Sequence, residues 1–83
     1  MLDVQILSSQ QVLFGGRVAS IVLPGEQGVF EVAPLHRPIV SRLLPGLILI
    51  EGQALRIRRG VVKVWQDTVV AIVEPVAVQD SAR

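Results

Sequence analysis

No stretch of this chain has the apolar spacing of an amphipathic helix. Its apolar residues come in short runs interrupted by glycine and proline, and no window of about 11 residues repeats them at i, i+3, i+4 and i+7. From Leu2 to Ile6, apolar and polar residues alternate, which is the period of a strand with one buried face. Valine and isoleucine supply most of the apolar content, while aromatic residues are only 4%. We therefore predict an all-β fold.

Turn-forming residues divide the chain into about eight to ten short strands. Leu2–Ile6 is predicted as a first, edge-like strand. Gly15-Gly16 is predicted as the hairpin turn between Gln11–Phe14 and a return strand, Arg17–Leu23. Leu47–Ile50 is apolar on both faces, which predicts burial on both sides and hence two packed layers. The remaining predicted strands are Val29–Val32, Ile39–Leu44, Ala54–Arg59, Val61–Trp65, Thr68–Val73 and a short Val76–Val78.

The predicted architecture is a single domain over residues 1–83, a flattened two-layer β-sandwich or barrel. A chain of this size buries a modest share of its surface, so a partner could supply part of its stability. Eight basic and seven acidic side chains give a net charge of +1, which excludes a strong overall field for nucleic acid or anionic lipid. The absence of cysteine excludes a disulfide scaffold and suits the cytoplasm. No signal peptide is visible, and the longest apolar run, Leu43–Ile50, is interrupted by Pro45 and Gly46.

His36 is the only histidine, and Pro34 and Pro38 restrict the backbone on either side of it. Catalysis or metal binding would need partners, and the chain has no cysteine, no second histidine and no serine in a nucleophile-elbow pattern. The alternatives are a hydrogen-bonding role in a loop or interface, or an incidental exposed position. The acidic residues are single and scattered, so we predict no catalytic, cofactor or metal site.

Two clusters have both a structural and a functional interpretation. The glycines of Gly25–Gly28 permit a tight turn, and the lysine and hydroxyl residue of a phosphate-binding loop do not follow them. The densest basic cluster suits a solvated face, a protein-docking face or a face for single-stranded nucleic acid. It comprises Arg56, Arg58, Arg59 and Lys63, with Trp65 nearby. A small β-barrel that binds nucleic acid through Arg56, Arg58, Lys63 and Trp65 is the alternative function.

Five sequence landmarks follow one another along the chain. They are Phe-x-Gly-x-Val at Phe14–Val18, Pro-Gly-x-x-Gly at Pro24–Gly28, Pro-x-His-x-Pro at Pro34–Pro38, Pro45-Gly46, and a glycine with two valine-rich strands, Gly60–Val64 and Val69–Val73. In this order they resemble the N-terminal β-domain of the epsilon subunit of the F-type ATP synthase, from Leu2 to about Val76. The departures from the family pattern are Val29 for a common acidic residue, Leu35 for glycine, Arg37 for alanine and Arg59 for a second glycine.

The resemblance implies a non-catalytic central-stalk subunit of a rotary, ion-translocating ATP synthase, with no cofactor. Such a subunit docks the gamma subunit to the membrane proteolipid ring and supports the coupling of ion flow to ATP synthesis. The implied gamma interface is His36, Arg37, Pro38, Ile39 and Val40. The implied proteolipid-ring interface is Gly25, Glu26, Gln27, Gly28, Val29 and Glu31. The chain would be soluble when isolated and would lie at the cytoplasmic face of the inner (plasma) membrane only through the complex.

Two further expectations follow from the resemblance. The docking role implies an exposed apolar patch on one face of the sandwich and poor stability of the isolated chain. Epsilon subunits commonly continue into a C-terminal helical hairpin that binds ATP in some bacteria and inhibits hydrolysis, and no such segment follows Pro75 in this sequence. If Arg83 is the natural end, we expect no ATP binding by this subunit; a shortened piece is the alternative.

Overall fold

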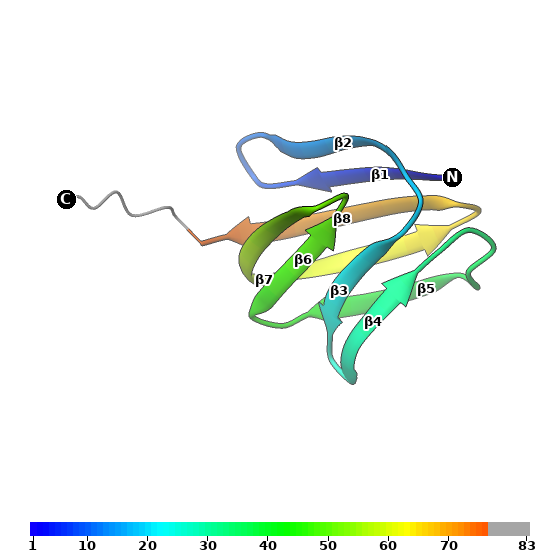
Figure 1. The fold of residues 1–83 in the computed structure, drawn as a ribbon. Coiled ribbons are helices and arrows are strands. Elements are labelled where there is room, and N and C mark those ends of the chain that lie inside the picture. The colour runs from blue at the N-terminus through cyan, green and yellow to red at the C-terminus, as the bar shows by residue number, and fades with distance from the viewer. Residues whose placement is uncertain (77–83) are drawn as a thin grey trace.

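The computed structural model describes residues 1–76, which form eight β-strands (Figure 1). The strands are β1 (Leu2–Leu7), β2 (Val12–Val18), β3 (Ile21–Gly25), β4 (Gly28–Val32), β5 (Ile39–Leu43), β6 (Gly46–Ile50), β7 (Gln53–Trp65) and β8 (Thr68–Pro75). Within this part of the chain, no helix is long and apolar enough to cross a membrane. The all-β prediction is confirmed, and the number of strands is the lower bound of the predicted range.

The strands pair in the order β2-β1-β8-β7-β5-β3-β4, with β6 between β3 and β7. The long strand β7 connects two layers, because its N-terminal half pairs with β6 while its C-terminal half pairs with β5 and β8. One layer contains β2, β1, β8, the second half of β7 and β5. The other contains the first half of β7 with β6, β3 and β4, which cross in front of the first layer in Figure 1. This arrangement is the predicted flattened sandwich.

The core lies between the two layers and is made of aliphatic side chains. Burial alternates along β1, where Leu2, Val4 and Ile6 are buried and the residues between them are exposed. The remaining buried hydrophobic residues are Val18, Ile21, Leu23, Val32, Leu43, Ile48, Ile50, Ile57, Val62, Val64, Val69, Ala71 and Val73. No polar or charged residue of the described part is buried. The core therefore carries no polar group that could serve as an internal site.

The first hairpin differs from the prediction. Gly15 and Gly16 lie inside β2, where they pair with Gln5 and Val4 of β1. The turn lies at Ser8–Gln11, where the Ser8 hydroxyl accepts hydrogen bonds at 3.2 Å from the backbone N–H groups of Gln10 and Gln11. The side chain of Ser8 therefore stabilises the turn of this hairpin, for which the sequence had suggested the flexible Gly15-Gly16.

Two assignments that depended on this turn are also wrong. Leu2–Ile6 is not an edge strand, because β1 pairs with β2 on one side and with β8 on the other. Arg17–Leu23 is not one strand, because the chain leaves the first layer at Ala19–Ser20 and begins β3 in the second layer at Ile21. The edge strands of the sheet are β2 and β4.

The prediction that Leu47–Ile50 is buried on both faces is half wrong. Ile48 and Ile50 are buried, whereas the side of β6 that carries Leu47 and Leu49 is outward, with these residues 39% and 43% exposed. Apolar residues on both faces of a strand therefore indicate here one core face and one exposed apolar face. The predicted strands Val29–Val32, Ile39–Leu44 and Thr68–Val73 are confirmed to within two residues. Of the predicted Val76–Val78, Val76 lies beyond the end of β8, and the rest lies outside the described residues.

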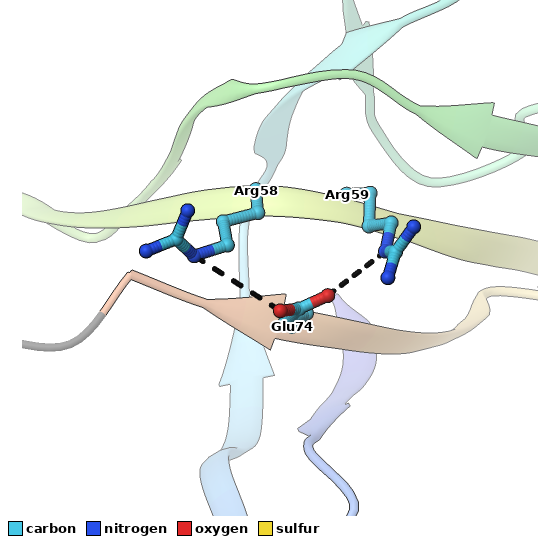
Figure 2. A network of polar contacts seen from close by, with 3 residues as sticks. All are labelled: Arg58, Arg59 and Glu74. Atoms are coloured by element: carbon cyan, nitrogen blue, oxygen red, sulfur yellow. Dashed lines mark hydrogen bonds and ion pairs between the residues drawn. The ribbon is translucent and has the colours of Figure 1, made fainter.

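The predicted strands Ala54–Arg59 and Val61–Trp65 are one continuous strand, β7, with an irregularity opposite Glu74 and Pro75. Between Ile57 and Arg59 the register with β8 shifts by one residue, so that Arg58 and Arg59 are both exposed. Figure 2 shows Glu74 between them, with its carboxylate 2.8 Å from Nε of Arg59 and 4.0 Å from Nε of Arg58. Such a β-bulge bends a strand, which allows β7 to pass from one layer to the other.

Candidate docking surfaces

A groove of about 450 Å³ runs along one open side of the sandwich, between edge strand β4 and strand β5. The strand β5 pairs with β7 on its other side and meets β3 only where Leu43 lies opposite Gly25. The groove is lined by Gly25, Glu26, Gln27, Gly28, Val29, Phe30, His36, Arg37, Ile39, Val40 and Ser41. It therefore brings together nine of the eleven residues that the sequence assigned to two interfaces; Glu31 and Pro38 are not in its lining.

One end of the groove is the turn between β3 and β4, at Glu26-Gln27. Gly28 has φ of 119°, a conformation that favours glycine, whereas Gly25 is required for space. A Cβ on Gly25 would lie 2.6 Å from the Phe30 ring, so that ring packs directly over the backbone. The carboxylate of Glu26 lies 3.5 Å from Nε of Arg42 on β5. Packing therefore fixes the base of this turn, while Glu26 and Gln27 at its tip are exposed to solvent.

The other end of the groove is formed by the loop of residues 33–38, which follows the C-terminal end of β4. A backbone hydrogen bond from His36 to the carbonyl of Ala33 closes a turn. Asp67, in the β7–β8 turn, accepts a hydrogen bond at 2.8 Å from the N–H of Leu35. His36 is half-buried, and its Nδ1 donates to the carbonyl of Arg37 at 2.7 Å. In this structure the histidine ring organises the loop, consistent with the hydrogen-bonding alternative.

Leu35 has a backbone conformation that leucine rarely adopts. Its φ is 70°, in the left-handed region, which costs a residue with a side chain roughly 1–2 kcal/mol. The resemblance places glycine at this position, and glycine would adopt the same conformation without that cost. The Leu35 side chain is 91% exposed, so burial does not offset the cost. The sequence pattern identified the departure but not the strain.

The residues assigned to the gamma interface divide into two groups. Arg37, Pro38 and Val40 are exposed, with Val40 at 72%. Ile39 is half-buried and packs against the core, because its side chain points inward on β5. Ile39 also lines the groove, so it presents part of its side chain there while the rest holds the strand against the core.

The outer surface of the first layer carries apolar side chains on several strands, mixed with polar ones. We call the outward side chains of β5, the second half of β7 and β8 the β8 face; its apolar members are Val40, Val61, Trp65, Val70 and Ile72, and its polar members are Arg42, Arg59, Lys63, Thr68 and Glu74. Cross-strand pairs connect it, with Val40 opposite Lys63 and Val61 opposite Ile72. In the sequence, the signal for this surface is the unbroken apolar run Val69–Val73, whose outward residues have no core to fill.

The second layer has an apolar outer surface as well. We call it the β6 face; it consists of Val22, Leu47, Leu49, Ala54 and Arg56. Val22 lies opposite Leu49, and Leu49 lies opposite Ala54. The expectation of one exposed apolar face is therefore too simple, because the sandwich carries one on each side.

The family model for the ATP synthase delta/epsilon chain β-sandwich domain matches residues 1–78 of this chain. The chain belongs to this family. Among curated members, the ATP synthase epsilon chain of Bordetella avium is 32% identical over an alignment that covers 83% of this chain and 57% of that protein. The epsilon chain of Bordetella petrii is 31% identical, with the same coverage. The chain thus spans less than three fifths of the length of these curated relatives.

Solved structures share the fold of this chain. A chain in the structure of the central stalk and c-ring of the Tetrahymena thermophila mitochondrial ATP synthase superposes with a TM-score of 0.75 at 15% identity. That match covers 88% of this chain and 63% of the other. A chain of the Euglena gracilis mitochondrial ATP synthase gives a TM-score of 0.71 at 23% identity, covering 92% and 51% of the two chains.

The basic cluster of this chain does not form one surface. Arg56 lies on the half of β7 that pairs with β6, whereas Lys63 and Trp65 lie on the half that pairs with β5 and β8. Seven positions separate Arg56 from Lys63, about 23 Å along an extended strand, and Arg58 is paired with Glu74. Residues 1–76 therefore offer no compact basic and aromatic face for the nucleic-acid alternative.

Proposed function

We propose that this chain is a non-catalytic adapter in the rotor of an ATP synthase, docking the gamma subunit to the proteolipid ring. In this role it supports the coupling of ion flow to ATP synthesis and lies at the cytoplasmic face of the membrane through the complex. Membership of the delta/epsilon family supports the stalk assignment. The placement of the two expected docking segments at opposite ends of β4 carries the adapter assignment.

A rotor adapter must pass torque between two partners without opening locally. Both segments meet this requirement, because both are attached to one continuous hydrogen-bonded sheet. The β3–β4 turn is held by the pairing of β3 with β4 and by the Glu26–Arg42 ion pair. The loop of residues 33–38 is held to the β7–β8 turn by Asp67. The turn would contact the ring and the loop would contact gamma.

The gamma side extends beyond the loop in this proposal. Val40 is the outward residue of β5 that follows the loop, and it lies beside Lys63 on the β8 face. A gamma surface that covers Arg37 and Val40 would therefore cover part of this apolar face as well. Burial of these exposed apolar side chains would stabilise the complex.

The carboxylates of the ring side provide a test. Substituting Glu26→Gln and Glu31→Gln together removes two exposed negative charges without changing side-chain shape. We expect about three- to tenfold weaker binding of the gamma complex of this chain to purified proteolipid ring, since charged groups at an interface rim mainly set encounter and register. Quantitative pull-down at low salt measures the effect.

Glu51→Gln is the matched control for this charge change. Glu51 lies in the β6–β7 turn and has no assigned interface role. Glu51→Gln should leave ring binding unchanged. Both this variant and the double variant should bind gamma with the affinity of the wild type. Normal ring binding of the double variant would contradict a contribution of these two carboxylates to the ring contact.

A further inference from the structure

Leu35 combines three features that together need an explanation. Its φ of 70° is strained for leucine. Its side chain is 91% exposed, the largest fraction among the exposed large hydrophobic residues of the described chain. It lies within the Pro34–Pro38 segment, between two prolines. A non-glycine residue held in the left-handed region with its side chain in solvent suggests a role in binding.

The surrounding contacts hold this leucine in one place. Its N–H donates to Asp67 on the β7–β8 turn at 2.8 Å, and the neighbouring His36 N–H closes the turn to Ala33 at 3.2 Å. Pro34 and Pro38 restrict the chain on either side. A partner that binds Leu35 would therefore meet a backbone whose conformation is already fixed, which lowers the entropic cost of binding.

The position of Leu35 indicates which partner it serves. It lies at the opposite end of β4 from the turn assigned to the ring, a separation of about 16 Å for a strand of this length. It continues directly into Arg37, Pro38 and Val40, the exposed residues of the gamma side. Through Asp67 it is attached to the turn that follows Trp65 on the β8 face.

We propose that Leu35 is an apolar anchor that enters an apolar pocket on the gamma subunit. The inference rests on the proposed function and adds an apolar contact to the gamma side. The chain accepts a strained backbone in the free state, and the anchor contributes affinity in the complex.

Stability and affinity should therefore change in opposite directions when Leu35 is replaced. Leu35→Gly relieves the backbone and removes the anchor, so we expect the melting temperature of the chain to rise by about 2–5 °C. The affinity for the gamma subunit of the same organism should fall about tenfold or more. Leu35→Asn, whose side chain tolerates this conformation, should also weaken binding.

Two control variants isolate the role of the anchor. Leu35→Met keeps an apolar side chain and should keep the affinity within about threefold of the wild type. Leu47→Asn removes an exposed leucine from the β6 face, which has ordinary strand geometry, and should leave gamma binding unchanged. Calorimetric titration of gamma with each full-length variant gives the affinities, and thermal unfolding of the same samples gives the stabilities.

The outcomes separate this inference from the proposed function. Tight binding by the wild type with unchanged affinity for Leu35→Gly overturns the anchor and leaves the adapter role intact. A Leu35→Gly chain that is less stable than the wild type contradicts the strain on which the inference depends. Failure of the wild-type chain to bind gamma at all overturns both.

Discussion

Gly60→Ala should destabilise this chain by about 2–3 kcal/mol, lowering its melting temperature by roughly 10–20 °C. A Cβ on Gly60 would lie 2.7 Å from the carbonyl oxygen of Ile72 and 3.1 Å from Cα of Val73. These are backbone atoms of β8, so the clash cannot be relieved by rotating a side chain. Gly60 directly follows the bulged Arg58 and Arg59, where β7 bends from one layer into the other.

Gly15→Ala is the matched control, because Gly15 also lies within a strand. The nearest atom to its added Cβ would be Cγ1 of Val12 at 3.9 Å, an ordinary contact. We expect the stability to change by no more than about 1 kcal/mol in either direction. Thermal and urea unfolding of both variants measures the difference. Equal melting temperatures for the two would show that the close approach of β7 and β8 is not what requires glycine at position 60.

The second large effect concerns binding to gamma. Arg37→Glu together with Val40→Asp should weaken the gamma complex about 100-fold or more, because a basic and an apolar contact both become acidic. Both side chains are exposed, so the fold should survive. The new aspartate would lie opposite Lys63 of β7, a favourable cross-strand pair. Isothermal titration with purified gamma measures the loss, and circular dichroism checks that the fold is retained.

Arg56→Glu with Leu49→Asp makes the same charge change on the β6 face. It tests whether any acidic patch on the sandwich disrupts the complex. The gamma affinity of this control should stay close to that of the wild type. A comparable loss in both double variants would mean that gamma does not distinguish the two apolar faces, and would remove the β8 face from the proposal.

Local sequence signals predicted the fold class well. Alternation in Leu2–Ile6 and the spacing of glycine and proline were sufficient for the strands, because each depends only on neighbouring residues. The errors arose where one residue type is compatible with two different local structures. Glycine at positions 15 and 16 serves strand pairing rather than a turn, and the bulge at Arg58 is visible only against its partner strand.

The candidate docking surfaces could be predicted less completely from the sequence than the fold could. The sequence predicted two separate interfaces, residues 25–29 with Glu31 and residues 36–40, and that most of these residues line one groove follows only from the pairing of β3, β4 and β5 across the sheet. The inward direction of Ile39 and the outward direction of Leu47 depend on register, which a one-residue shift would reverse. The strain at Leu35 depends on its φ, which no local pattern predicts.

Site-directed crosslinking in the assembled ATP synthase tests the adapter role most directly. The chain has no cysteine, so Val40→Cys and Gln27→Cys each introduce a single attachment point for a short photocrosslinker, at the two ends of the groove. We expect the probe at position 40 to label the gamma subunit and the probe at position 27 to label the proteolipid. Labelling of the same partner from both positions, or the reverse assignment, would contradict it.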